Sequence, residues 1–114
     1  IELTNIDHNR EVAIVACDTE MPEEIRAVAR YKRLNGSDVA EFGVVVEDGW
    51  QKRGLAKLMM TQLGLEARRM GVKTLIGYVL KGNEAMYSLM QSLGYTRQAD
   101  NDDDSFILFT LNLN

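Results

Sequence analysis

Cysteine, proline and histidine are scarce in this chain, and their scarcity excludes several classes of protein. Among 114 residues there is one of each. A single Cys17 cannot form an internal disulfide or a cysteine-based metal site. Such a composition is typical of proteins in a reducing compartment. We therefore predict a cytoplasmic protein with no disulfide framework and no metal site.

Long apolar runs and an excess of positive charge are also absent. The sequence contains no stretch of 18 apolar residues and no signal peptide, so we predict no membrane segment. The formal net charge is −4, and basic residues are scattered outside the region 53–73. This charge pattern argues against nucleic acid as the main partner.

The remaining composition is that of one globular domain. Apolar residues make up 46% of the chain and charged residues 26%, and 114 residues are close to the common domain size. The chain opens with Ile1 rather than methionine. We therefore expect residues 1–114 to be a single domain that forms a C-terminal piece of a longer polypeptide.

The first half of the chain predicts an antiparallel meander. Apolar and polar residues alternate in three segments, which indicates strands with one buried face. Asn35-Gly36 lies between the second and third segments and favours a hairpin, since both residues tolerate positive φ. The segment 1–10 is interpreted as a polar lead-in. The predicted strands are 11–18, 24–33 and 38–47.

The second half predicts two helices among three further strands. Leucines and methionines recur at helical spacing over 53–70, and Gly71 suits a left-handed C-cap. Asn83 is a good N-cap for an amphipathic helix that closes at Gly94. The order of elements indicates an α+β fold with a mixed sheet, in which a helix connects two parallel strands. The additional strands are 73–80, 95–99 and 106–112, the last two joined by an acidic loop.

The stretch Glu41–Met60 reads as a strand, a turn and the start of a helix. The first N–H groups of a helix have no partner within it, and the helix dipole is positive there. Residues 51–56 are therefore a candidate phosphate cradle. Gly54 would let a ligand approach the backbone closely, although a glycine that merely starts the helix is the alternative.

These motifs resemble the GNAT superfamily of acyl-CoA-dependent N-acyltransferases. Gln51-Lys52-Arg53-Gly54-Leu55-Ala56 matches the Gln/Arg-x-x-Gly-x-Gly/Ala pyrophosphate loop of that family, and Asn83 is followed eleven residues later by Gly94-Tyr95. Within the superfamily, the chain is most similar to the acetyltransferase domain of bacterial protein lysine acetyltransferases. That similarity rests on Ile6–Ala13, on Ala40-Glu41-Phe42, and on Met90 at a position where many members carry a tyrosine as general acid.

The resemblance implies a three-layer fold. Members have a mixed, mostly antiparallel, twisted sheet with helices on both faces. They also carry a first strand and two helices ahead of the strand that begins here near Glu11. With only ten residues before that point, the N-terminal strand and the two helices are expected to be missing.

The resemblance also implies acetyl-CoA as co-substrate and gives roles to particular residues. Glu41 is the expected general base, while backbone N–H groups of Val44–Val46 would face the thioester oxygen. Asn83 is equally well explained as an N-cap or as a contact to the donor, and Trp50 as a stacking surface or a cover for the core edge. Tyr87 is expected to pack or bind rather than to act as the acid. The expected cofactor-binding residues are Val44, Val45, Val46, Gln51, Lys52, Arg53, Gly54, Leu55, Ala56 and Asn83.

Three functions follow as hypotheses. The first is acetyl transfer to lysine side chains of a protein such as an acyl-CoA synthetase, with a synthetase-like domain preceding this one in the same polypeptide. The second is acetylation of a small amine. The third is a non-catalytic acyl-CoA-binding module that regulates a neighbouring domain.

Overall fold

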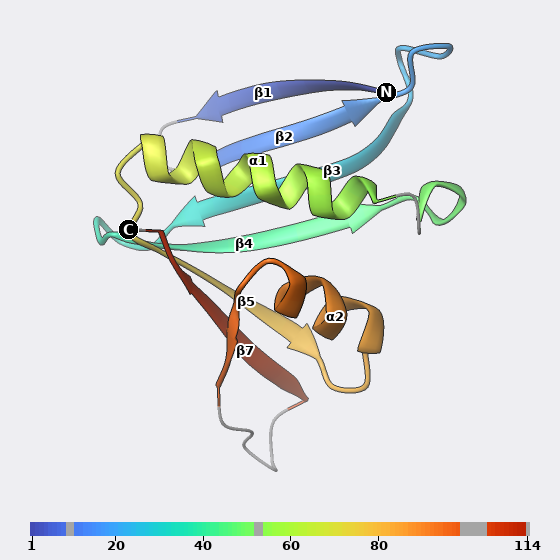
Figure 1. Ribbon diagram of the computed structural model, residues 1–114. Coiled ribbons are helices and arrows are strands. Elements are labelled where there is room, and N and C mark those ends of the chain that lie inside the picture. Colours follow the sequence, from blue (N-terminus) through green and yellow to red (C-terminus); the bar gives the residue numbers. More distant parts are fainter. Residues whose placement is uncertain (9–10, 52–53, 99–104, 114) are drawn as a thin grey trace.

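The computed structural model describes residues 1–8, 11–51, 54–98 and 105–113, and these form one sheet and two α-helices (Figure 1). A short 3-10 helix, η1, follows the fourth strand. In chain order the elements are β1 (Glu2–His8), β2 (Glu11–Cys17), β3 (Ile25–Arg33), β4 (Val39–Val46), η1 (Asp48–Trp50), α1 (Leu55–Arg69), β5 (Thr74–Leu80), α2 (Glu84–Ser92), β6 (Thr96–Arg97) and β7 (Phe106–Asn112).

The seven strands are hydrogen-bonded in the order β1-β2-β3-β4-β5-β7-β6. Every neighbouring pair is antiparallel except β4 and β5, which are parallel and are connected through α1. A parallel pair needs such a crossover because its strands run the same way. The predicted α+β class, the mixed sheet and the order of elements from β2 onward are thus confirmed.

The turn between β3 and β4 has the conformation that its sequence predicts. Asn35 and Gly36 both have positive φ, at 27° and 68°. The Ser37 N–H donates to the Leu34 carbonyl at 2.7 Å and closes the turn. Asn-Gly is the dipeptide that tolerates two such residues in succession, so it sets the register of this hairpin.

The prediction for the first ten residues is wrong, because Glu2–His8 forms a full strand. β1 pairs antiparallel with β2 over seven residues, from Glu2 opposite Cys17 to His8 opposite Glu11. Its side chains are mostly polar and exposed, and this hid the strand from a search for alternating apolar residues. An edge strand is held largely by backbone hydrogen bonds, which nearly any residue can supply. An N-terminal strand is therefore present, not missing.

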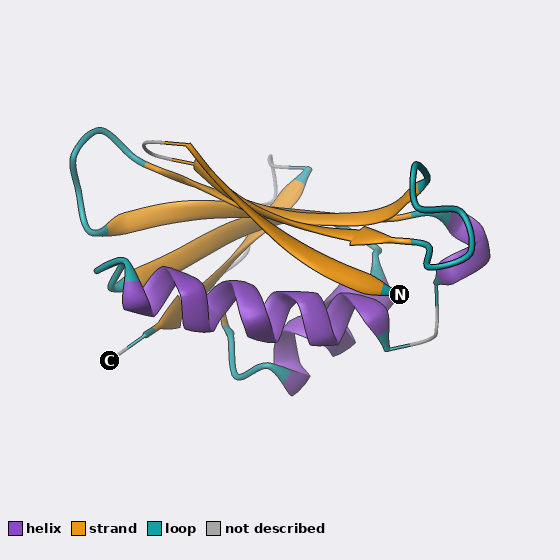
Figure 2. Ribbon diagram, turned by 90° about the horizontal axis from the view of Figure 1, so that it is seen from above, coloured by secondary structure: helices purple, strands orange, loops and turns teal. Residues whose placement is uncertain are grey.

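Both α-helices pack on one face of the sheet, as Figure 2 shows. The buried side chains of the strands and helices form a single cluster, in which Ile14, Met59, Leu63, Leu75 and Met90 are fully enclosed. The opposite face bears Val45, Tyr78, Leu80 and Phe106, each at least half exposed. The expectation of helices on both faces is thus corrected: the described residues form two layers instead of three.

Two leucines of α1, Leu63 and Leu65, show which face of the helix is buried. Leu63 is fully buried, whereas Leu65 is 64% exposed. We expect Leu63→Ala to lower the free energy of unfolding by about 2–5 kcal/mol, because it removes contacts and leaves a cavity. The same change at Leu65 should cost less than about 0.5 kcal/mol. Urea unfolding followed by circular dichroism measures both, and equal effects would contradict this assignment of the buried face.

Candidate functional site

The central feature of the site is the point at which β4 and β5 stop pairing. The parallel ladder joins Val39–Glu41 to Thr74–Ile76, and β4 then continues to Val46 bonded only to β3. We call the separation beyond the Glu41 and Ile76 pair the fork. Beyond it, one edge of β4 faces no described strand.

The direction of the backbone groups on that edge follows from the register with β3. The Glu47 N–H donates to the Arg26 carbonyl at 2.8 Å, and backbone groups in an antiparallel ladder point to alternate sides. The main-chain groups of Val44 and Val46 therefore point away from β3, toward the open edge, and those of Val45 point toward β3. The backbone groups of Val44 and Val46 thus face the open edge of β4, whereas those of Val45 do not.

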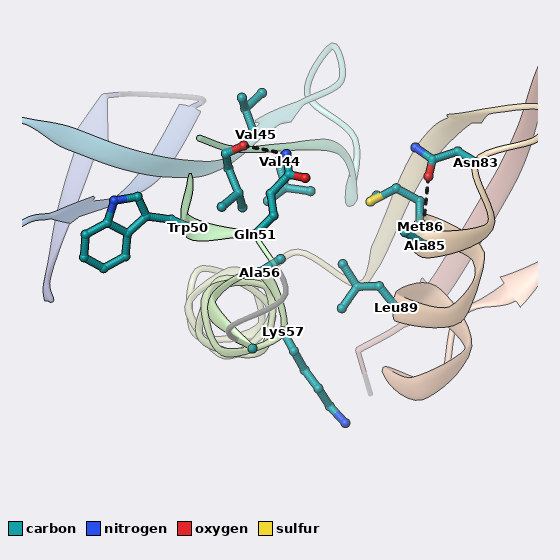
Figure 3. Close-up of a pocket in the computed structure, with 12 residues that line it drawn as sticks. Val44, Val45, Trp50, Gln51, Ala56, Lys57, Asn83, Ala85, Met86 and Leu89 are labelled. Carbon is teal, nitrogen blue, oxygen red and sulfur yellow. Dashed lines mark hydrogen bonds between the residues drawn. The ribbon is translucent and has the colours of Figure 1, made fainter. Parts of the chain in front are cut away.

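A cavity of about 500 Å³ lies at this edge, between the end of β4, the start of α1 and the start of α2 (Figure 3). Its lining is mostly apolar with a few polar groups, as is usual for sites that bind small molecules. The lining residues are Val44, Val45, Val46, Trp50, Gln51, Gly54, Ala56, Lys57, Asn83, Ala85, Met86 and Leu89.

Gln51 holds the turn at one wall of the cavity. Its side-chain amide nitrogen donates to the Val46 carbonyl at 3.0 Å and to Asp48 Oδ1 at 3.2 Å. The amide thereby satisfies a carbonyl at the end of β4, where no neighbouring strand remains to do so. Gln51 thus fixes the direction in which the chain leaves the strand and approaches the helix.

Gly54 is the N-cap of α1 and has a left-handed backbone, with φ at 76°. A Cβ placed there would meet no described atom within 4 Å. The glycine is therefore required by conformation and not by crowding from the protein, and the space beside it is open. Because Gly54 has no capping side chain, the first N–H groups of α1 can bind an external anion.

Asn83 and the first turn of α2 form the opposite wall. The Asn83 side-chain oxygen accepts a hydrogen bond from the Met86 N–H at 3.2 Å, so the predicted N-cap is present. The same residue lines the cavity together with Ala85, Met86 and Leu89. Asn83 therefore both caps α2 and lines the cavity.

Lys57 is the one ionised side chain among the described residues that line the cavity. It lies in the first turn of α1, is exposed, and extends outward from the rim in Figure 3. Sequence reasoning missed it because the helical pattern assigns Lys57 to the solvent side of α1. Its proximity to the glycine that starts the helix was the available signal.

Arg26, on β3, contacts residues at the outer end of the cavity. Its guanidinium contacts Asp18 at 3.1 Å and Glu47 at 3.0 Å, and its Cζ lies 5.7 Å from the centroid of the Trp50 ring. The backbone N–H of Glu20 and the Arg26 guanidinium lower the pKa of Asp18. Trp50 itself packs against the core and also lines the cavity.

Glu41 lies outside the cavity lining. It occupies the last pair before the fork, and its side chain is exposed on the face opposite the helices, since Ala40 and Phe42 on either side are buried. Lys32 is its cross-strand neighbour on β3. Among the described residues, no ion pair engages the Glu41 carboxylate.

The structure brings together most of the expected binding residues. Leu55 is an exception, because its side chain is buried in the core. Lys52 and Arg53 lie outside the described residues, as does the acidic loop at 100–104. The residues that the sequence reasoning did not assign to the site are Lys57, Ala85, Met86 and Leu89. Those that it assigned and that line the cavity are Val44, Val45, Val46, Gln51, Gly54, Ala56 and Asn83.

Neither Met90 nor Tyr87 lines the cavity. Met90 is fully buried in the core. The Tyr87 hydroxyl accepts a hydrogen bond from the Gly82 N–H at 2.8 Å, and its ring packs between Phe109, with centroids 6.0 Å apart, and the Arg97 guanidinium at 4.9 Å. Tyr87 therefore packs, as expected.

Neither α1 nor α2 combines the length and the apolar character needed to span a bilayer.

Comparison with known proteins identifies relatives of the whole arrangement. An acetyltransferase of Pseudomonas aeruginosa is 30% identical over 98% of this chain, which covers 61% of that protein. The GNAT domain of S. lividans PAT superposes with a TM-score of 0.80 at 23% identity, over 90% of this chain and 61% of the other.

The protein yncA of Salmonella typhimurium, whose structure contains acetyl-CoA, has a TM-score of 0.75 at 22% identity, over 91% of this chain and 65% of that one. The chain thus spans less than two thirds of the length of these three relatives. The family description for acetyltransferases of the GNAT type matches residues 2–95. This chain therefore belongs to the acetyltransferase (GNAT) family.

Proposed function

We propose that this chain binds acetyl-CoA and transfers its acetyl group to lysine side chains of a protein. The observation that carries the proposal is the cavity at the fork, which has a helix N-terminus and an open strand edge on the same side. A phosphate group and an extended amide chain are the ligand parts that such a site suits. Family membership and the acetyl-CoA in the yncA structure support the choice of donor.

The donor would be held at two places. The uncapped N–H groups at the start of α1, beside Gly54, would bind the pyrophosphate. The open-edge groups of Val44 and Val46 would pair with the amides of the pantetheine arm, as an added strand does. In this arrangement the Val44 N–H is the better candidate for contact with the thioester oxygen, because Val45 directs its N–H toward β3.

The chemistry requires a base because a lysine side chain has a pKa near 10.4, so only about one molecule in 2,500 is neutral at pH 7. We assign this role to Glu41, which would take the ammonium proton directly or through water. The free amine then attacks the thioester carbonyl, and the carbon–sulfur bond breaks. Since neither Met90 nor Tyr87 lines the cavity, the leaving thiolate would take a proton from water or from the amine.

The acceptor is proposed to be an exposed lysine of a protein such as an acyl-CoA synthetase. The similarity of Ala40-Glu41-Phe42 and Ile6–Ala13 to bacterial protein lysine acetyltransferases supports this choice, as does the likeness in fold to the GNAT domain of PAT. A synthetase-like domain in the same polypeptide remains part of the proposal.

Substitution of the proposed base tests the reaction. With acetyl-CoA and a candidate acyl-CoA synthetase, Glu41→Gln should lower the initial rate of acetylation by about 10²-fold or more, because general base catalysis is lost. Binding of acetyl-CoA, followed by calorimetry, should persist, because Glu41 does not line the cavity. Equal rates for both proteins would remove Glu41 from the mechanism.

The same assay separates the alternative functions. Turnover of free small amines without labelling of protein would favour a small-amine acetyltransferase. Tight binding of acetyl-CoA with no transfer to any acceptor would favour a regulatory binding module. Absence of acetyl-CoA binding would overturn all three functions.

The cation at the rim should contribute to binding of the phosphates. We expect Lys57→Met to weaken acetyl-CoA binding about fivefold at low ionic strength, as for one exposed ion pair. The loss should shrink in about 1 M salt, because exposed charges are screened. Lys73→Met, which removes the same charge outside the cavity lining, is the matched control. A loss that is equal in the two variants would show that only net charge matters.

Two substitutions of Asn83 should separate its role as a cap from a role in binding the donor. Asn83→Ala removes the cap and should destabilise the fold by about 1 kcal/mol, whereas Asn83→Ser keeps a capping oxygen and should cost less than about 0.5 kcal/mol. If the amide also contacts the donor, both variants should bind acetyl-CoA more weakly. Thermal unfolding and calorimetry measure the two effects, and unchanged affinity in the serine variant would leave Asn83 as a cap only.

A further inference from the structure

Phe42 follows the last β4 and β5 pair and fills the space where the next pair would form. Continuing the register of Ala40 with Leu75 and Glu41 with Ile76 would place Phe42 beside Gly77. A Cβ built on Gly77 would lie 2.0 Å from Cε2 and 2.1 Å from Cζ of Phe42. The aromatic ring therefore spans from β4 to β5 and rests on the backbone of Gly77.

The ring is held firmly in this position. Phe42 is only 7% exposed and makes an edge-on contact with the Tyr95 ring, with centroids 5.3 Å apart and an interplanar angle of 63°. Edge-to-face contacts of this kind are favourable in addition to the burial of apolar area. Because interiors are close-packed, the ring cannot move aside without displacing its neighbours.

The position of the ring matters for a donor that lies along the open edge of β4. If the proposed function holds, the pantetheine arm starts near Val46 and runs back along the strand toward the fork. Between phosphate and sulfur the arm is about as long as four residues of extended chain, or ~14 Å. Four residues before Val46 is Phe42. The acyl group would then lie next to the Phe42 ring.

We infer that Phe42, seated over Gly77, closes the inner end of the donor site and restricts it to short acyl chains. The inference rests on the proposed function, because it assumes that acyl-CoA lies along β4. The acyl chain of the donor would extend past the sulfur into the volume that the ring occupies. Acetyl would fit in front of the ring, and each further methylene would press against it.

The size of the ring predicts the size of the effect. In a packed apolar pocket, one methylene changes discrimination by about 10- to 200-fold. Removing most of the ring in Phe42→Ala should therefore raise the affinity for butyryl-CoA relative to acetyl-CoA by at least about tenfold. Phe42→Leu removes less volume, and the ratio should rise by about threefold to tenfold.

Equilibrium binding measures this ratio without any need for turnover. Trp50 is the sole tryptophan of the chain and lines the cavity, so its fluorescence reports occupancy. The titrants are CoA, acetyl-CoA and butyryl-CoA, and each affinity is expressed relative to CoA in the same variant. Phe109→Leu is the matched control, because Phe109 is also buried, at 3% exposed, but lies on β7, away from the open edge of β4.

The outcomes separate this inference from the proposed function. A raised butyryl to acetyl ratio in the Phe42 variants, with no change in Phe109→Leu, supports it. An unchanged ratio in Phe42→Leu, with CoA still bound, overturns the inference and leaves the proposed function intact. Failure of the wild-type chain to bind CoA or either thioester overturns both. If thermal unfolding shows that Phe42→Ala does not fold, Phe42→Leu decides.

Discussion

The termination of the β4 and β5 ladder at Glu41 and Ile76 is the constraint on which the candidate site depends. A sheet normally satisfies the backbone groups of an internal strand on both sides. Here β4 loses one neighbour halfway along its length, and the groups that are released face a cavity and not solvent alone. Gln51 compensates for one of them at Val46. The backbone groups of Val44 stay available to a ligand. The binding surface therefore exists because β4 and β5 stop pairing before this point.

Much of this arrangement was predictable from sequence because local rules determine it. Asn35-Gly36 specifies its hairpin, Asn83 specifies a cap, and the glycine of the 51–56 loop indicates a helix start with exposed N–H groups. These features need only residues that are close together in the chain. The Gln51 to Val46 hydrogen bond belongs to the same local segment, although its partners were not foreseen.

Features that depend on distant residues were not predictable. β1 lacks an apolar pattern, and its existence depends on the free edge of β2. Lys57 and Leu89 meet at one cavity only because α1 and α2 pack on the same face. The contact between Phe42 and Gly77 joins strands that are separated by a helix, and no spacing rule relates them. Tertiary packing decided each of these cases.

The polar character of β1 has a further consequence for the behaviour of the chain in solution. Unpaired strand edges are templates for association, and natural sheets protect them with charge or with short length. Among the described residues, β1 forms one edge of the sheet and carries Glu2 and Asp7, while β6 forms the other and is only two residues long. Both edges of the described sheet thus carry features that oppose edge-to-edge growth into fibrils. The exposed Val45, Tyr78, Leu80 and Phe106 lie on its broad face, where contacts do not propagate backbone hydrogen bonding.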